Sequence, residues 1–303
     1  MNIMNMSKYD LKKMKKFSLA RGLINTEAEL FILKVKNDWN IEYKMLKVFY
    51  NNSGSNFSNK LFTINELIDK KEIINMNELV IPEKILIIND EVKGFSMPYI
   101  KSVSFETVLN DFKIDNLNKI EYFKQISNIL KKMDQLRKNS ELSDFYLNDI
   151  HENNFIVNNE TDKINVVDLD SCKIGGNKPF ASKYLTMYAP ISNMNSKYKI
   201  NNDINFSSYV IPDKNTDLYC YTMMIINFLF KGKANLMNRD KYYLYLDYLR
   251  SIGYSYNLLD KFYKIYEYVD NELIDEELNE LNNDMIYKSH HKIFEMKIKI
   301  SKT

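Results

Sequence analysis

The chain has 303 residues, of which 45% are hydrophobic and 13% aromatic, with 42 basic and 40 acidic side chains. This hydrophobic content excludes a disordered chain, and the nearly balanced charge gives no support for a protein that binds nucleic acid or a membrane surface. The two cysteines, Cys172 and Cys220, lack the spacing of a metal site, and the longest apolar run, residues 223–230, is too short to cross a bilayer. We therefore expect a cytoplasmic globular protein with no nucleic-acid partner and no membrane partner.

The first hundred residues are expected to be mostly strands. Residues 1–18 predict a basic leader. The segments "ELFILKV" and "YKMLKVFY" that follow are rich in β-branched and aromatic residues, which favour strands. The polar tract "NNSGSNFSNK" (51–60) predicts a loop, and residues 61–74 carry apolar side chains at helical spacing. Two more strand-like runs, "EKILIIND" and "GFSMPYI", are joined by residues 89–94 in a predicted hairpin.

After residue 100 the pattern becomes mainly helical. Apolar residues recur every three or four positions from about 115 to 137 and predict an amphipathic helix. The polar stretch "YLNDIHENN" is followed by two short strands, 154–157 and 164–167, with a turn between them. A second helical pattern begins at Thr216 and ends at Gly232, and further helices rich in Tyr and Leu are expected up to residue 299.

Polar side chains gather where the expected hairpin opens. Asn154 begins its first strand and Asp168 ends its second, so an antiparallel pair would place them side by side. Asp149 enters the same end from the preceding loop. Two carboxylates and an amide oxygen are hard ligands that suit Mg²⁺ and a phosphate-bearing substrate, and Asp149 could instead act as a base. Asp and Asn also cap turns very often, so a purely structural interpretation stays open.

The order of these residues resembles the catalytic loop and metal-binding segment of the protein kinase superfamily. "LNDIHENNFIV" takes the place of the family's His-Arg-Asp loop, and "VVDLDSC" takes the place of its Asp-Phe-Gly segment. Elsewhere, "KMLKVFY" offers Lys47 as the strand lysine, and "INELI" offers Glu66 as its partner on the next helix. "TDLYCYTMMIINFLF" offers Asp217 as the aspartate that opens a hydrophobic helix and bonds to the catalytic-loop backbone.

This resemblance implies a two-lobed α+β fold. The basic leader (1–18) would precede an N-terminal lobe over residues 19–100, made of an antiparallel β-sheet with one helix, and a mainly helical C-terminal lobe over residues 101–303. The resemblance also implies an ATP-dependent phosphotransferase that uses Mg²⁺, with Mn²⁺ as an alternative ion. The expected acceptor is Ser or Thr of a protein substrate.

The resemblance assigns a role to each matching residue. Lys47, held by Glu66, would contact the α- and β-phosphates, and Asp149 would accept the proton of the attacking hydroxyl group. Asn154 and Asp168 would hold the metal. The expected nucleotide-binding residues are Lys47, Gly22 of the phosphate loop, Met97 as the gatekeeper, and Pro98 and Ile100, whose backbone would meet adenine.

The chain also departs from the family's pattern. The phosphate loop is poor in glycine, with Gly22 alone, which makes close backbone approach to phosphates harder. Leu147 and Asn148 replace the catalytic-loop His and Arg, and Asp170 replaces the glycine of the metal segment. Without that arginine, control through a phosphorylated activation loop is not expected.

Three alternatives remain open. His151, two residues after Asp149, lies where small-molecule kinases of the aminoglycoside and choline type often carry a histidine, so a small-molecule acceptor is one alternative. The glycine-poor loop favours a second, a catalytically weak pseudokinase that serves as a nucleotide-binding scaffold. Asp168 and Asp170 also form an Asp-x-Asp pattern like that of glycosyltransferases, but this third alternative explains neither Lys47 nor Asp217.

Overall fold

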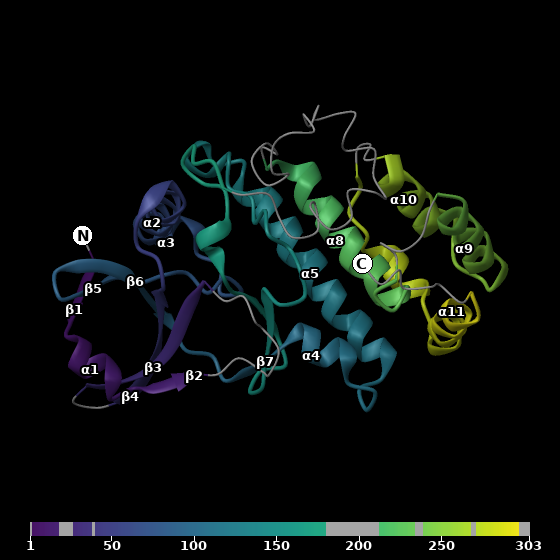
Figure 1. Ribbon diagram of the computed structural model, residues 1–303. Helices are drawn as coiled ribbons and strands as arrows, with labels where there is room; N and C mark the ends of the chain where they lie inside the picture. The colour runs from purple at the N-terminus through teal and green to yellow at the C-terminus, as the bar shows by residue number, and fades with distance from the viewer. Residues whose placement is uncertain are drawn as a thin grey trace.

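The computed structural model describes residues 2–17, 27–37, 40–179, 212–233, 239–267 and 271–296. The described chain is mixed α and β, as the sequence predicted. Figure 1 shows a curled sheet formed by the N-terminal elements and a larger, mainly helical part formed by the later described elements. Within the described ranges, no helix combines the length and the apolar character needed to cross a membrane.

The large sheet has the strand order β1-β5-β6-β4-β3-β2. Its strands are β1 (Ile3–Met6), β2 (Lys15–Phe17), β3 (Ala28–Asn37), β4 (Asn40–Phe49), β5 (Lys84–Ile88) and β6 (Glu91–Pro98). Neighbouring strands are antiparallel except for β1 and β5, which are parallel. Because side chains alternate between the two faces of a strand, Met45 and Lys47 share one face of β4 while Leu46 belongs to the other.

Residues 1–18 were expected to form a leader, but the described part of this segment, residues 2–17, contributes two strands to this sheet. Strand β1 pairs with β5, strand β2 pairs with β3, and the short helix α1 (Lys8–Lys12) connects them. Met4, Met6 and Leu11 pack against the cluster around Leu46. These apolar side chains are scattered among lysines and asparagines, so the sequence shows no clear strand pattern here. The segments become strands because the edges of the sheet supply hydrogen-bond partners for their backbone.

Helix α2 (Gly54–Asp69) covers the sheet face that carries Met45 and Lys47, and the short helix α3 (Lys71–Ile74) follows it. The prediction of a loop over residues 51–60 is wrong from Gly54 onward, because the helix begins inside that polar tract. Its first turns are largely solvated, so hydrophobic periodicity could not show them. The hairpin of β5 and β6 is confirmed, with a tight turn at Asn89 and Asp90, both in the left-handed region.

The described residues after residue 100 form a helical core and a small sheet. The helices are α4 (Phe105–Asn110), α5 (Asn116–Leu136), α8 (Lys214–Leu229), α9 (Arg239–Ser251), α10 (Tyr256–Glu267) and α11 (Asn283–Glu295). The small sheet has the order β7 (Ser102–Ser104), β8 (Phe155–Asn158) and β9 (Ile164–Val166). Short 3₁₀ helices cover Ser140–Leu142, Leu169–Ser171 and Glu276–Glu280.

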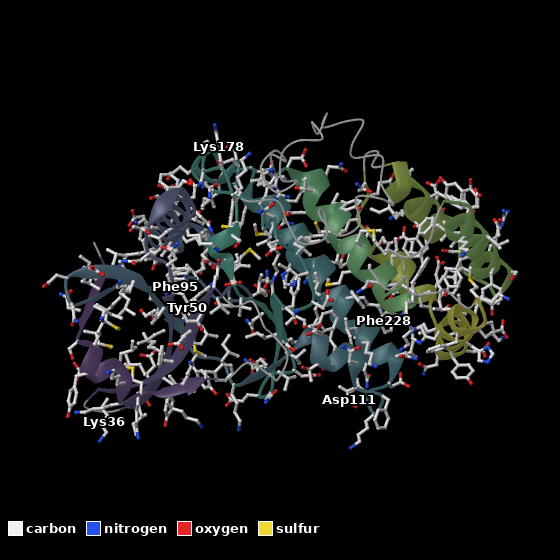
Figure 2. The ribbon with its side chains drawn as sticks, in the orientation of Figure 1. Lys36, Tyr50, Phe95, Asp111, Lys178 and Phe228 are labelled. Atoms are coloured by element: carbon white, nitrogen blue, oxygen red, sulfur yellow. The ribbon has the colours of Figure 1, made fainter. Side chains whose placement is uncertain are left out.

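Helix α8 lies at the centre of the helical part, and side chains on every face of it are buried. Figure 1 shows it running beside α5, and Figure 2 shows Phe228 among these helices, well away from Phe95 of the large sheet. The predicted helices around residues 115–137 and 216–231 are confirmed. Gly232 follows the second with φ of +68°, a conformation that glycine adopts at low cost after a helix.

Candidate functional site

The hairpin of β8 and β9 places Asn154 and Asp168 at one end, as the sequence predicted. Phe155 pairs with Val166, and the backbone N–H of Val167 donates to the carbonyl of Asn154 at 2.9 Å. Asp168 follows directly and has φ of +64°, in the left-handed region that Asp tolerates better than most residues. The antiparallel register therefore places Asn154 and Asp168 at the same end of the hairpin.

The loop before the hairpin is held by Asp217. This residue lies in the first turn of α8, and its carboxylate accepts the backbone N–H groups of Leu147 at 3.0 Å and Asn148 at 2.7 Å. Burial raises the pKa of Asp217 to about 6, against the opposing effect of these two hydrogen bonds. Asp217 therefore bonds to the backbone of this loop, a contact that the sequence predicted.

Asp149 is oriented by two neighbours in the same loop. The side-chain amide of Asn154 donates to the backbone carbonyl of Asp149 at 2.9 Å and to its carboxylate at 3.3 Å. His151 places Nε2 3.5 Å from the same carboxylate, while its Nδ1 accepts the backbone N–H of Asn153 at 3.2 Å. Because Nδ1 is an acceptor, the neutral ring carries its proton on Nε2, facing Asp149.

Lys47 is a buried lysine, 6% exposed, whose ammonium group meets carboxylates that are distant in sequence. It contacts Asp168, lies 2.9 Å and 3.1 Å from the two carboxylate oxygens of Asp170, and lies 3.3 Å from Glu27. Burial would lower the pKa of Lys47, but the three carboxylates together hold it above its ordinary value. Lys47 therefore links the large sheet to the segment that follows β9.

The expected pairing of Lys47 with Glu66 is not found. Glu66 forms an ion pair with Lys70 at 2.8 Å, and its carboxylate lies beside Gly175, where an added Cβ would come within 2.5 Å of it. In the described part of the chain, the carboxylates that contact Lys47 are those named above. The cause is helical phase, because Lys60, Thr63 and Leu67 form the buried side of α2 and Glu66 lies off that side.

Lys60 is a site residue that sequence reasoning missed. Its ammonium group donates to Glu27 at 2.7 Å, to Asp170 at 3.0 Å and to the hydroxyl group of Ser171 at 3.3 Å. The polar tract predicts a loop at this position, although the spacing of Lys60 from Thr63 and Leu67, three and seven positions, is that of one helix face. Extending the helical pattern back into the polar tract would have found it.

The two aspartates of the Asp-x-Asp segment are in different electrostatic environments. Burial would raise the pKa of Asp170, but Lys47 and Lys60 together hold it below its ordinary value. Burial raises the pKa of Asp168, and the neighbouring charge of Asp170 adds to this effect while Lys47 opposes it. Two ammonium groups, those of Lys47 and Lys60, therefore compensate the negative charge of Asp170. The negative charge of Asp168 is less well compensated, because the ion pair with Lys47 is the only one found for it in the described part of the chain.

The expected nucleotide-binding residues lie on the strand next to Lys47. Strand β6 pairs with β4 so that Phe95 faces Lys47 and Met97 faces Met45, and Met97 is buried. Pro98 ends the strand and Ile100 follows it at the start of the connection to β7. Gly22 lies outside the described residues.

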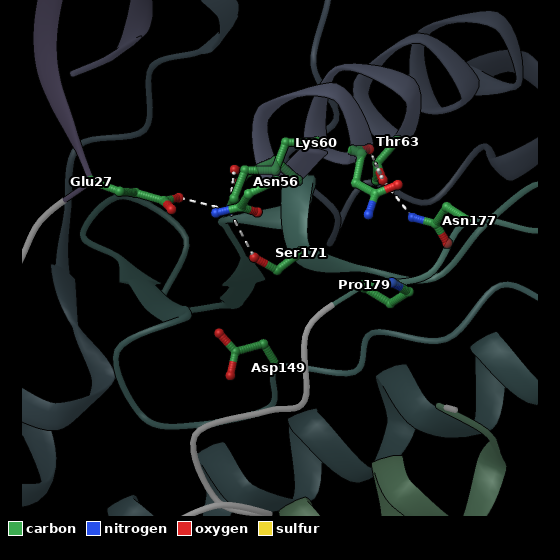
Figure 3. Close-up of a pocket in the computed structure, with 10 residues that line it drawn as sticks. Glu27, Asn56, Lys60, Thr63, Asp149, Ser171, Asn177 and Pro179 are labelled. Atoms are coloured by element: carbon green, nitrogen blue, oxygen red, sulfur yellow. Dashed lines mark hydrogen bonds and ion pairs between the residues drawn. The ribbon is translucent and has the colours of Figure 1, made fainter. Parts of the chain in front are cut away.

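Asp149 and Lys60 also line one cavity, of about 220 Å³ (Figure 3). The other lining residues are mostly polar and come from the residue before β3, from α2 and from the chain after Asp168: Glu27, Asn56, Asn59, Thr63, Asp170, Ser171, Asn177 and Pro179. Within the described ranges, no three or more His, Cys, Asp or Glu side chains converge as a metal-binding group. The predicted ligand pair, in contrast, combines one carboxylate with one amide.

Comparison with models of known protein families found no match for this chain, and comparison with curated proteins found none either.

Proposed function

We propose that the chain is a two-lobed, kinase-like phosphotransferase that transfers the γ-phosphate of Mg-ATP to Ser or Thr of a protein substrate in the cytoplasm. The observation that carries the proposal is the meeting of Lys47, from the middle of the large sheet, with Asp168, 121 positions later, at the hairpin end that also holds Asp149 and Asn154. Phosphoryl transfer by kinases of this type uses a lysine on a strand, an aspartate in a loop, and an Asn/Asp pair that binds the metal.

The residues at the hairpin end fit a divalent cation. The amide nitrogen of Asn154 is turned toward Asp149, so the amide oxygen is its remaining polar atom. Asp168 carries the less compensated negative charge of the Asp-x-Asp segment. Asn154 and Asp168 would hold Mg²⁺, or Mn²⁺ in its place, and the bound ion would offset phosphate charge.

The other side chains would supply position and charge. Asp149 would accept the proton of the attacking hydroxyl group, with His151 and Asn154 fixing the direction of its carboxylate. Lys47 would exchange carboxylate oxygens for phosphate oxygens when the nucleotide binds. Adenine would lie against the end of β6 at Met97, Pro98 and Ile100. Glu66 has no role in this proposal.

Two observations favour alternatives. His151 beside Asp149 favours a hydroxylated small molecule as the acceptor, in place of a protein. The ammonium group of Lys47 contacts Asp168, the expected metal ligand. This contact favours a scaffold that binds nucleotide but does not transfer phosphate. The proposed transfer is preferred because Lys47, Asp149, Asn154 and Asp168 are all retained, and a scaffold has no chemical need for the four together.

The test is transfer of label from ATP labelled on the γ-phosphate, in Mg²⁺, to the protein itself and to casein, with Asp149→Ala in parallel. Label that requires Asp149 supports the proposal. Absence of label on protein, with label on an aminoglycoside or choline-like acceptor, selects the small-molecule alternative. Absence of any transfer, with ATP still raising the melting temperature, selects the scaffold.

A further inference from the structure

Lys60 and Lys47 share the same two carboxylates. Nζ of Lys60 lies 2.7 Å from Glu27 and 3.0 Å from Asp170, and Nζ of Lys47 lies 3.3 Å from Glu27 and 2.9 Å from Asp170. The four side chains therefore form a closed ring of alternating charge. The ring ties α2 to β4, to the segment after β9 and to the residue that precedes β3.

The two carboxylates of this ring differ in their access to water. The side chain of Glu27 is 45% exposed, whereas that of Asp170 is fully buried. A buried carboxylate that loses its counter-charge is strongly destabilising, so Asp170 has to keep an ammonium group at all times. Glu27 can exchange an ammonium group for water at much lower cost.

The aromatic ring of Phe49 restrains both lysines. The ammonium group of Lys47 lies 5.3 Å from the ring centroid and that of Lys60 lies 5.9 Å from it. Attraction between a cation and a π-face acts on both lysines, and Phe49 itself is fixed by contacts with Phe57 of α2 and Phe95 of β6. Lys60 is therefore held beside Asp170 by the same residues that position Lys47.

We propose that Lys60 is the positioning residue that couples helix α2 to the site, by neutralising Asp170 so that Lys47 is released to the phosphates of the bound nucleotide. This inference rests on the proposed phosphotransfer. The family pattern uses a helix carboxylate to hold the strand lysine. In this chain the helix supplies an ammonium group instead, which acts on Lys47 through Asp170, and Glu66 is left on another side of α2.

The experiment compares label transfer in the native protein, Lys60→Met, Asp170→Asn and the double variant. Lys60→Met should lower kcat/KM for ATP about tenfold or more, because Lys47 then stays with Asp170. In the Asp170→Asn background the same substitution should change kcat/KM by less than about threefold, because no buried charge remains to be neutralised. A lysine that only packs against α2 would cause the same loss in both backgrounds.

Two further variants sharpen the comparison. Lys60→Arg keeps the positive charge and should recover most of the activity lost in Lys60→Met. Glu66→Gln, on the same helix, should change kcat/KM by less than about twofold. An activity loss that is larger for Glu66→Gln than for Lys60→Met overturns the inference, and so does an equal loss for Lys60→Met in the two backgrounds.

Failure of the proposed function gives a different result. If the native protein transfers no label to any acceptor, the phosphotransfer proposal fails, and thermal unfolding of the same four proteins still tests the coupling of Lys60 to Asp170. The melting temperature should fall more on Lys60→Met in the native background than in the Asp170→Asn background. An equal fall in both backgrounds overturns the coupling itself, whether or not the protein transfers phosphate.

Discussion

The carboxylate of Asp217, in the first turn of α8, accepts the backbone N–H of Asn148 at 2.7 Å, 69 positions earlier in the chain. Asn148 has φ of +62°, in the left-handed region, and its own side chain donates to the carbonyl of Ser171 at 2.9 Å. One buried aspartate thus fixes the turn that leads into Asp149. The shape of the loop therefore depends on a buried residue of α8 as well as on hydrogen bonds made by the loop's own residues.

Replacing Asp217 by Ala should therefore lower both stability and activity. The two N–H groups of Leu147 and Asn148 would lose their acceptor in a buried place, which costs about 2–4 kcal/mol of the free energy of unfolding. Urea denaturation measures this loss. Asp284→Ala, an exposed acid in the first turn of α11, is the matched control and should change the free energy by less than about 1 kcal/mol. Equal effects would contradict the role of Asp217.

His290 should make the protein less stable in mild acid. The ring is buried in α11 against Phe228, and burial, helped by nearby lysine charges, lowers its pKa from 6.5 to about 4. Between these two pH values the unfolded chain binds a proton that the folded chain excludes. The contribution of His290 to the free energy of unfolding should therefore fall by about 3 kcal/mol as pH drops from about 6.5 to about 4. Asp217, whose pKa is raised to about 6, acts in the opposite direction over part of this range, so the contribution of His290 is read from the difference between the native protein and a variant.

The matched pair for this prediction is His290→Gln and His291→Gln. The first variant keeps a donor for the carbonyl of Phe228 but cannot titrate, so its stability should fall less steeply over this pH range than that of the native protein. The second removes an exposed histidine from the same helix and should leave the slope unchanged. Urea titrations at several pH values measure both slopes, and parallel slopes in the native protein and His290→Gln would refute the assignment.

Asp168→Asn should separate metal-dependent from metal-independent nucleotide binding. If Asp168 and Asn154 hold Mg²⁺, the rise in melting temperature that ATP causes should depend on Mg²⁺ in the native protein and lose that dependence in the variant. Label transfer should fall by about a hundredfold or more. Asp162→Asn, in the turn of the same hairpin, is the control and should retain the Mg²⁺ effect. Retained Mg²⁺ dependence in Asp168→Asn would exclude Asp168 as a ligand.

Two neighbouring glycines should respond differently to alanine. Gly175 and Gly176 both have positive φ, of +63° and +80°, so alanine is strained at either position by about 1 kcal/mol. At Gly175 the added methyl would also meet the Glu66 carboxylate, whereas at Gly176 nothing lies within 4 Å. Gly175→Ala should therefore be the more destabilising in thermal unfolding, and adding Glu66→Ala should reduce the difference. Equal losses would show that Glu66 moves aside freely.

Local pattern was sufficient for the elements whose residues repeat with a clear period. The helices around α5 and α8 follow from apolar spacing near 3.6 residues, and the strands β3 to β6 and the hairpin of β8 and β9 follow from short runs rich in β-branched and aromatic residues between turn signals. The hairpin register follows too, and it places Asn154 beside Asp168. Asp149 and Asp217 could be named as candidates because their spacing from this hairpin resembles a known family.

Tertiary structure decided what periodicity cannot show. The sequence contains the strands at 3–6 and 15–17, but only the sheet edges make them strands, because they need backbone partners. The inward position of Lys60 on α2 can be read from helical spacing, but its partners Glu27 and the buried Asp170 come from other parts of the chain, and local pattern does not show them. Glu66 was expected beside Lys47 from its order in the sequence, yet helical phase turned it toward Lys70. Two charged side chains form an ion pair only when they lie close together in space, and the order of residues in the sequence does not give their distances.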